Sequence, residues 1–445
     1  MADKGEGGAV DPNTGMSEAE MKKGEVQNQV NFFMLGLLIV LIVSILVICS
    51  KFFRTFLSLK RLAIYRTNEL NPRSIFDIKD ENGNKYGEIT IEDTNYSDDN
   101  KAAKIEKHRL RDFYIASAYR PYLCYYHKYD YVSIEVFKEV LKAGPRMIEL
   151  EIFNSNYGDK VEPVVSVGEE KGEWMYTLNA IHIKQFLRAI NETVFNTNLV
   201  GGVAKDPFII LLNLKTNKNI KCLNKLHKYI YSELNQHLLG TTYSYNAKKT
   251  SNTDFYPRIL DIPLIECQNK VILFAHGDFE DTNLEEIINY STVSNYTIKN
   301  AKKQRRMIYL DYNDIVETEE DIEDYVNPEF HKVAKNDVKE YCKYSYGILR
   351  PKVVDGDSLF TNISPINPEA GRGLEAGMQF IMMNYQKIDT NMSNYAYIFK
   401  DSSFVQKAQR THNDTPKNIT YVGKKVEDIA LNQSELNYLY VTTKS

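Results

Sequence analysis

Two acidic residues, Glu149 and Glu151, are the clearest candidates for chemistry in this 445-residue sequence. They stand two positions apart in an apolar run that is predicted to be a strand, so both side chains should project from the same face. Paired carboxylates can bind a divalent cation or act together as an acid and a base. Among the eight histidines, His276 is the one that stands at the end of a predicted strand and is well placed for function.

The elements that would position these residues begin near residue 108, where short apolar runs start to alternate with amphipathic helical patterns. Such alternation is typical of a parallel sheet covered by helices. Eight runs are found, the number that closes a (β/α)8 barrel, so the predicted fold class is α/β with a TIM-type barrel. These runs are Tyr114–Ser117, Met147–Phe153, Val164–Ser166, Phe208–Leu214, Val271–Phe274, Met307–Leu310, Gly347–Arg350 and Gln379–Asn384. A further strand is predicted at Tyr395–Phe399. Because working residues of such barrels lie at the carboxyl ends of the strands, both glutamates should face the barrel mouth.

Short motifs along the chain share their order and spacing with those of one enzyme family. The first half contains FYIASAYRPYL, SIEVFKEVLKAGPRMIELEIFNS, EPVVSVG and FIILLNLKTN, and the second half contains GMQFIMMNYQ and YAYIFK. These segments resemble the X and Y regions of eukaryotic phosphoinositide-specific phospholipase C. The resemblance implies a catalytic-type barrel over residues 108–408, with an X-like part at 108–239 and a Y-like part at 257–408.

The same resemblance identifies where this chain departs from the catalytic positions of the family. The first catalytic histidine of the family falls on Tyr119, and the second falls on Val167. The phosphate-binding lysines of the family fall on Phe274 and His276. Valine cannot titrate, and tyrosine, with an ordinary pKa near 10, is a poor base at neutral pH. Since each acid–base role typically contributes a factor of about 10²–10⁴ in rate, we expect no catalytic residue and predict a pseudoenzyme.

The calcium site implied by the resemblance is also altered. Two of its four ligand positions fall on the acidic residues Glu149 and Glu151, whereas the other two fall on Arg120 and Lys215. Two cations would repel a divalent ion, so no metal or other cofactor is expected. Instead, we expect Arg120 and Lys215 to neutralise the two glutamates through internal ion pairs. The alternative is that the long cations turn out to solvent and the glutamates bind water.

One uncharged segment, Phe32–Cys49, predicts a transmembrane helix at residues 30–50. The segment is too long for the apolar core of a signal peptide, and it lacks the polar face of a buried core helix. More cations follow it than precede it, so the positive-inside rule places everything after residue 51 on the cytosolic side. The remaining segments are predicted to be a disordered tail at 1–29, a basic juxtamembrane segment and spacer at 51–107, and a C-terminal tail at 409–445.

The composition limits the partners and the compartment of this chain. A net charge of −4 argues against a nucleic-acid partner. Five scattered cysteines without CxxC spacing indicate free thiols in a reducing compartment. The abundance of Asn, Lys, Ile and Tyr is typical of an AT-rich genome and suggests a protist or a large DNA virus as the source. Trp174, the single tryptophan, is expected to pack against the protein, with a lipid-facing position as the alternative.

Three functional hypotheses follow, from different classes. The first is a catalytically inactive barrel, anchored to a membrane on its cytosolic face, that acts as a structural or interaction protein with an unidentified protein partner. In a large DNA virus this would be a virion membrane protein associated with the capsid. The second is a binding module in which Arg120, Lys215 and His276 hold an anionic phosphoinositide headgroup without cleaving it. The third, which is less favoured, is a phosphodiesterase with altered chemistry.

Overall fold

The computed structural model divides the chain into two compact units, Met1–Phe56 and Leu57–Ser445. It describes residues 18–69, 72–79, 85, 108–157, 160–169, 172, 174–250, 259, 262–292, 306–317, 332–343, 345–351 and 366–407. The predicted C-terminal tail, 409–445, lies outside these residues, as do residues 1–17.

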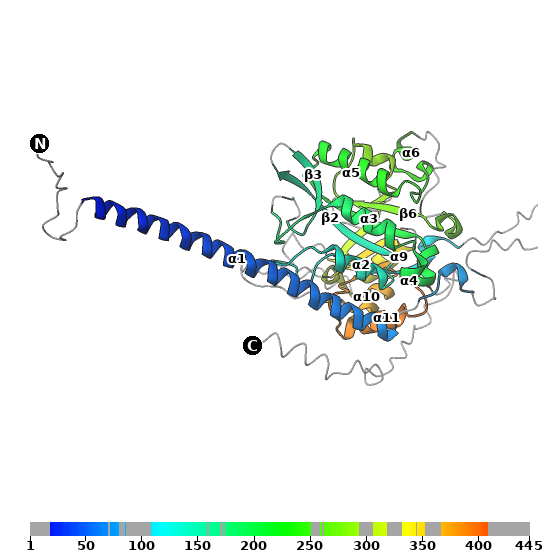
Figure 1. Ribbon diagram of the computed structural model, residues 1–445. Helices are drawn as coiled ribbons and strands as arrows, with labels where there is room; N and C mark the ends of the chain where they lie inside the picture. Colours follow the sequence, from blue (N-terminus) through cyan, green and yellow to red (C-terminus); the bar gives the residue numbers. More distant parts are fainter. Residues whose placement is uncertain are drawn as a thin grey trace, which may run out of the picture. The chain divides into compact units, whose positions relative to one another are not determined.

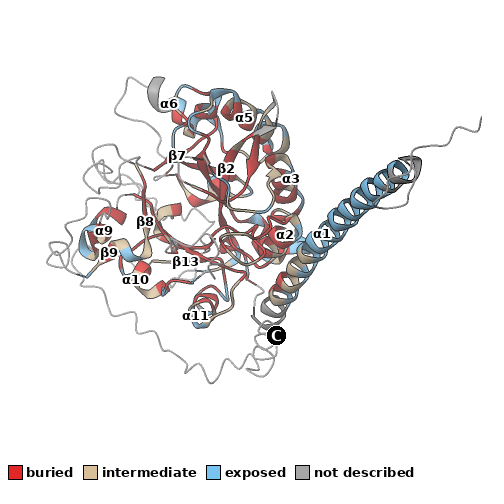
Figure 2. Cartoon of the chain, turned by 90° about the vertical axis from the view of Figure 1, so that its left-hand side faces the viewer, coloured by how far each residue is buried: buried red, intermediate tan, exposed pale blue. Residues whose placement is uncertain are grey.

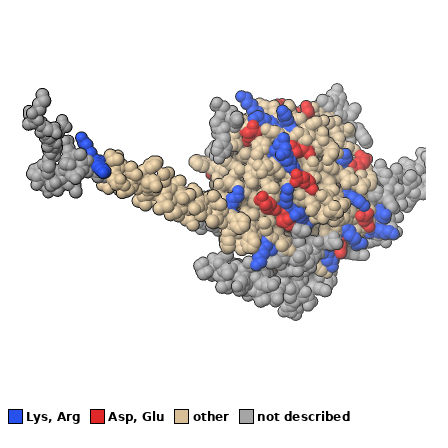
Figure 3. Space-filling view, viewed as in Figure 1, with Lys and Arg blue, Asp and Glu red and all other residues tan. Residues whose placement is uncertain are grey.

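A single long helix, α1 (Glu18–Glu69), forms the described part of the first unit and continues into the second (Figure 1). Its length and apolar composition make it a candidate membrane-spanning helix. The apolar side chains of Phe32–Cys49 are exposed on every side of the helix, and no charged residue interrupts them (Figures 2 and 3). The helix differs from the sequence prediction at its start. Residues 18–29 are helical where a disordered tail was expected, because their Glu, Ala, Met, Lys and Gln residues favour helix.

The second unit contains a parallel eight-stranded barrel whose strands follow one another in chain order. Parallel pairing joins every neighbour from β7 through β1 to β8, and a parallel bridge between Thr292 and Met307 closes the ring between β7 and β8. The barrel strands are β1 (Phe113–Ala118), β2 (Met147–Tyr157), β5 (Phe208–Lys215), β6 (Val271–His276), β7 (Tyr290–Ser291), β8 (Ile308–Asp311), β11 (Gly347–Arg350) and β12 (Phe380–Met383). The predicted TIM-type fold class is therefore confirmed.

Helices cover the outside of this barrel and connect its strands. The described helices of the second unit are α2 (Ile134–Lys142), α3 (Ile183–Thr193), α4 (Thr197–Val200), α5 (Ile220–Leu234), α6 (Tyr245–Thr250), α9 (Lys335–Cys342), α10 (Ala370–Glu375) and α11 (Thr390–Ile398). Figure 2 shows the strands buried at the centre and the helices buried on the side that faces them. The strands thus separate two cores, one inside the barrel and one between the barrel and the helices.

Two predicted strands do not belong to the barrel. Val164–Ser166 overlaps β3 (Lys160–Val165), which pairs antiparallel with the extended end of β2 and with β4 (Ile181–His182). Its place in the ring is taken by β7, whose two residues form no apolar run that a sequence pattern could detect. The predicted strand Tyr395–Phe399 instead forms the end of α11, which Asp389 caps at its start and Phe399 follows as the C-cap residue. Tyr395 and Phe399, four residues apart, are both buried.

Besides β3 and β4, three more short strands lie outside the barrel path. The strand β13 (Phe404–Gln406) pairs antiparallel with β1, while β9 (Ile315–Val316) and β10 (Val333–Ala334) form a separate two-stranded sheet.

The predicted spacer at 51–107 is in part a component of the barrel unit. Leu62, near the end of α1, is fully buried in the outer core. Ile75 and Phe76 are buried in the cluster inside the barrel, and the backbone N–H of Ile75 donates to Asp206 Oδ1 at 3.0 Å. The spacer prediction was wrong for these residues because two or three apolar side chains give no periodic signal in a charged segment.

Candidate functional site

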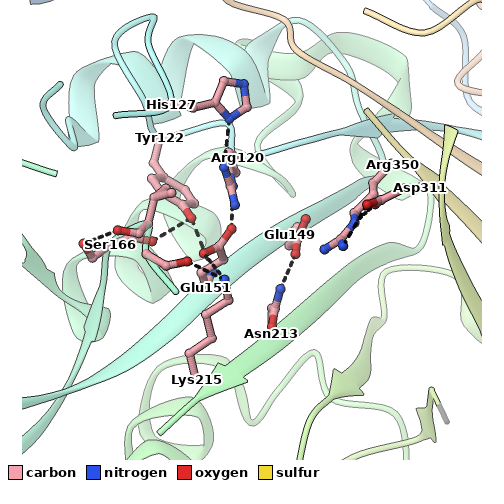
Figure 4. A network of polar contacts seen from close by, with 12 residues as sticks. Arg120, Tyr122, His127, Glu149, Glu151, Ser166, Asn213, Lys215, Asp311 and Arg350 are labelled. Carbon is pink, nitrogen blue, oxygen red and sulfur yellow. Dashed lines mark hydrogen bonds and ion pairs between the residues drawn. The ribbon is translucent and has the colours of Figure 1, made fainter. Parts of the chain in front are cut away.

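The carboxyl ends of the strands bring a set of polar side chains together at the barrel mouth (Figure 4). Glu149 and Glu151 alternate along β2 with residues of the outer core, so both point inward as the spacing predicted. Asn213 and Lys215 project from the end of the neighbouring strand β5. All four side chains are buried, which makes their charge balance decisive for what the site can do.

Glu151 binds two cations at once. Arg120 donates from Nε to Glu151 Oε1, and Lys215 Nζ lies 3.0 Å from Glu151 Oε2. The exposed fractions of the three side chains are 5% for Arg120, 8% for Lys215 and 0% for Glu151. Burial alone would raise the pKa of Glu151, but the charges of Arg120 and Lys215 outweigh it and hold that pKa below its usual range.

Arg120 itself is held by more than its ion pair. Its Nη1 donates to His127 Nδ1 at 2.8 Å, and its guanidinium lies 4.8 Å from the ring centre of Tyr119. Its backbone adopts a left-handed conformation with φ +43°, and its carbonyl accepts from Gln386 Nε2 at 2.7 Å. Burial, reinforced by the charge of Arg120, lowers the pKa of His127 to about 3, so His127 is a neutral acceptor.

Glu149, in contrast, has no ion-pair partner among the described residues. Its Oε1 accepts from Asn213 Nδ2 at 2.7 Å and from the Tyr309 hydroxyl at 2.8 Å. Burial, followed by the negative charge of Glu151, raises the pKa of Glu149 and favours its neutral form. The expectation that Arg120 and Lys215 would neutralise both glutamates is therefore correct for Glu151 and wrong for Glu149.

The two positions that correspond to histidines in the resembling family carry no base. The Tyr119 hydroxyl is fully buried without a hydrogen-bond partner in the described part of the chain, and burial raises its pKa well above the usual value. Val167 is buried and has no titratable group. Nδ1 of His276 forms a hydrogen bond with Thr292 Oγ1 at 2.7 Å, and the centres of the His276 and Tyr309 rings lie 4.5 Å apart. Burial, assisted by the charges of Arg350 and Lys215, lowers the pKa of His276 to about 3.

A second ion pair on the far side of the mouth was missed by the sequence analysis. Arg350, the last residue of β11, forms an ion pair with Asp311, the last residue of β8. Its Nη1 also donates to the Tyr309 hydroxyl at 3.3 Å. Their positions in the sequence could have identified Arg350 and Asp311, because both residues stand at the carboxyl ends of predicted strands, as Lys215 does.

The loop that follows β3 closes the mouth above Lys215. Lys215 Nζ donates to the carbonyl of Gly168 at 2.8 Å. Gly172 adopts φ +74°, and a Cβ at this position would lie 1.9 Å from the carbonyl oxygen of Lys215. This close approach of two backbones requires glycine. Trp174, in the same loop, is 67% exposed, so the expectation that it packs against the protein is wrong.

These residues do not fit the calcium ion that the resemblance implies. Both oxygens of Glu151 are taken by Arg120 and Lys215, and within the described ranges no three His, Cys, Asp or Glu side chains gather as a metal site. The three residues proposed for an anionic headgroup are also engaged. Arg120 and Lys215 are both paired with Glu151, and His276 is neutral. The arrangement is a buried polar core in which both cations of the mouth are already paired with Glu151.

Comparison with known proteins gives one family match. Residues 106–274 match the family described as phosphatidylinositol-specific phospholipase C, X domain, which covers less than half of the chain. No curated protein matches the sequence.

Solved structures of phospholipases C resemble the chain at low identity. PLC21 of S. officinalis and PLC21 of L. pealei are each 18% identical, over 68% of this chain and 37% of theirs, with TM-scores of 0.48 and 0.49. A calcium-dependent phosphoinositol-specific phospholipase C from Pseudomonas sp is 10% identical, over 64% of this chain and 94% of its own, with a TM-score of 0.37. The chain thus corresponds to little more than a third of the length of the two PLC21 proteins.

Proposed function

We propose that this chain, a relative of phosphatidylinositol-specific phospholipase C through its X-domain match at residues 106–274, is a catalytically inactive barrel anchored to a membrane. In this proposal the barrel acts as a structural or interaction protein and does not cleave phosphoinositides. Because the resembling enzymes are active, the proposal depends on which side chains the barrel mouth contains and how they are paired.

The observation that carries the proposal is the double ion pair on Glu151. A divalent cation needs carboxylate oxygens that are free to bind it, and those of Glu151 are occupied by Arg120 and Lys215. Displacing either cation would leave a buried positive charge without a partner, next to the incoming metal. The mouth is therefore stable as it stands and resists the ion that would stabilise charge during phosphodiester cleavage.

The acid–base groups support the same conclusion. Tyr119 occupies the position that the resemblance assigns to the first catalytic histidine, and its raised pKa makes proton abstraction at neutral pH unfavourable. Val167, at the second position, cannot protonate a leaving alkoxide. His276 and His127 are buried and neutral, and both are already hydrogen-bonded. The reaction requires one group that accepts a proton and a second group that donates one. None of these four residues is suited to either role.

Anchoring is supported by the apolar helix α1. Its uncharged run Phe32–Cys49 is long enough to cross the hydrocarbon core of a bilayer, and Lys51 and Arg54 follow it directly. The positive-inside rule then assigns the barrel to the cytosolic face. If the source is a large DNA virus, the proposal becomes that of a virion membrane protein, and detection of the chain in purified particles tests it.

A headgroup-binding module is the weaker candidate. It would need Arg120, Lys215 and His276 to present charge to a phosphate, but two of them are paired with Glu151 and the third is neutral. A phosphate would have to compete with a buried carboxylate for both cations.

Hydrolysis of phosphatidylinositol and its bisphosphate by the full-length protein, with and without calcium, tests the proposal. The full chain is required, because truncation at residue 67 would remove the buried Leu62 from the outer core. We expect no product above that of protein-free vesicles. Calcium-stimulated turnover that disappears in Glu149→Gln would overturn the proposal, since that substitution removes only the carboxylate character of a residue whose hydrogen bonds glutamine can keep.

A further inference from the structure

Residues 72–79, which we call the strap, lie across the amino-terminal end of the barrel, opposite the mouth. A Cβ at Gly144, in the turn before β2, would lie 3.2 Å from Pro72 Cγ. A Cβ at Gly202, in the segment before β5, would lie 3.1 Å from the backbone nitrogen of Ser74. The strap therefore packs closely on the chain segments that lead into two neighbouring barrel strands.

One buried carboxylate, that of Asp206, holds the strap by two hydrogen bonds. Its Oδ1 accepts from Ser74 Oγ at 2.6 Å and from the N–H of Ile75 at 3.0 Å. Ser74 Oγ in turn accepts from the N–H of Phe76 at 3.2 Å and so caps the short helix η1 (Ile75–Asp77). This turn places Ile75 and Phe76 in the core inside the barrel. Removal of the strap must break the bonds to Asp206 and uncover both apolar side chains.

Asp206 is buried without an ion-pair partner in the described part of the chain. It is 0% exposed, and its Oδ2 accepts no hydrogen bond from any residue that the structure describes. The charge of Arg146 acts on it, but Arg146 is itself 1% exposed and donates from Nη1 to the Val194 carbonyl at 3.2 Å. Nε and Nη2 of Arg146 have no partner among the described residues. A buried carboxylate that is not paired favours its neutral form.

The charged groups around Asp206 do not outweigh its burial. Arg146 approaches from the start of β2, and Asp77 approaches from the strap. Asp77 is about half exposed and lies 3.6 Å from Lys205, which stands just before Asp206 in the chain. Burial raises the pKa of Asp206 to about 7, because the charge of Arg146 and the two hydrogen bonds from the strap offset it only in part. Asp206 therefore exchanges its proton near neutral pH.

We propose that Asp206 is a pH-sensitive latch: its neutral form keeps the strap seated, and its ionisation favours release of the strap from the amino-terminal end of the barrel. Release lets water reach the carboxylate, whereas the seated strap keeps the carboxylate buried. The inference goes beyond the proposed function, and it depends neither on catalytic inactivity nor on anchoring. Because the strap is a short segment with two apolar anchors, its release is a local opening that leaves the barrel folded.

The direction and size of the pH effect follow from the two states of Asp206. With the strap seated, Asp206 keeps its proton up to about pH 7. With the strap released, the hydrated carboxyl should have an ordinary pKa of about 4. Between these values only the seated state binds the proton, so the ratio of released to seated strap should rise about tenfold per pH unit and level off above about pH 7.

Hydrogen exchange of the full-length protein in detergent, measured by mass spectrometry from pH 5 to pH 8, tests the latch. The rates are corrected for the pH dependence of chemical exchange itself. We expect the protection of the strap amides to fall by about 100-fold over this range, mostly below pH 7. At every pH, the strap amides should be less protected than those of β5. Equal protection of the strap and β5 would overturn the proposal, because the strap would then leave only when the whole barrel unfolds.

Three variants identify the group responsible. Asp206→Asn keeps an oxygen that accepts from the strap and removes the titration, so protection of the strap should no longer depend on pH. Asp77→Asn, a matched change at the half-exposed acid of the strap, should leave the pH dependence intact. Ser74→Ala removes one bond to Asp206 and should lower protection at every pH while keeping its pH dependence.

Two further outcomes would overturn the latch. The first is protection of the strap in the unmodified protein that does not change between pH 5 and pH 8, a result that needs no variant to fold. The second is an unchanged pH dependence in Asp206→Asn that circular dichroism shows to be folded, because another group would then control the strap.

Discussion

Replacing Glu151 by glutamine should destabilise the barrel far more than the same change at Glu149. In Glu151→Gln, the buried side chains of Arg120 and Lys215 both lose their counter-ion. In Glu149→Gln, the hydrogen bonds from Asn213 and Tyr309 to Oε1 can be kept, and little charge is lost because the pKa of Glu149 is raised. The two substitutions are chemically identical and two residues apart, so each serves as the control for the other.

The size of the effect follows from burial. Removing one partner of a buried ion pair typically costs about 3–5 kcal/mol. Lys215 keeps its bond to the Gly168 carbonyl and Arg120 keeps its bond to His127, so we expect the lower end, about 3 kcal/mol. A barrel of about 300 residues has an unfolding entropy near 0.6 kcal/mol/K, so Tm should fall by roughly 5 °C. For Glu149→Gln the expected loss is below about 1 kcal/mol.

The assay is urea and thermal unfolding of the full-length protein in detergent, followed by circular dichroism. A double-mutant cycle adds Arg120→Met to Glu151→Gln, and the second substitution should cost less in the presence of the first. Equal losses for Glu149→Gln and Glu151→Gln would refute the reasoning. Strict additivity of the cycle would show that Arg120 and Glu151 do not stabilise each other.

Three further predictions concern the site, its cover and the topology. The pKa of His276 is about 3 in the folded barrel and near 6.5 in the unfolded chain, so only the unfolded state binds a proton between these values. The free energy of unfolding should therefore fall as the pH drops from about 6.5 toward 3. In urea titrations, His276→Gln should make this decline less steep. Gly172→Ala should destabilise by about 1–3 kcal/mol, because its Cβ meets the Lys215 carbonyl at a positive φ, whereas Gly240→Ala, with open space around it, should be close to neutral in the same unfolding measurement. Protease added to sealed microsomes should digest the barrel and spare a small N-terminal fragment; glycosylation at Asn191 would show the opposite orientation.

Alternation along β2 was enough to predict that Glu149 and Glu151 face the mouth. It could not predict that Glu151 alone would take both cations. Glu149 Oε1 instead accepts hydrogen bonds from Asn213 and Tyr309, and one of these comes from a strand more than 150 residues away in the sequence. Side-chain pairing across a barrel is a property of the closed fold, so strand patterns alone do not contain it.

The fold was predictable in kind, but one of its strands was assigned wrongly. Seven of the eight apolar runs are barrel strands, and β7 was missed because two residues are too few to show a pattern. Val164–Ser166 was chosen in its place, since an antiparallel hairpin strand is as apolar as a barrel strand. The burial of Leu62 and the exposure of Trp174 could likewise not be predicted from the sequence, because both depend on which surfaces the folded barrel leaves uncovered.

The central claim is that ion pairs within the barrel mouth prevent a calcium ion from binding there. A comparison of calcium binding by the full-length protein and by an Arg120→Asn/Lys215→Glu double variant tests this claim most directly. The double variant returns an uncharged and an acidic side chain to the two positions where the resemblance implies metal ligands, and it frees both oxygens of Glu151. By titration calorimetry, we expect no calcium binding to the unmodified protein and measurable binding to the variant once circular dichroism has shown it to be folded. Calcium binding by the unmodified protein, with an affinity equal to that of the variant, would contradict the account.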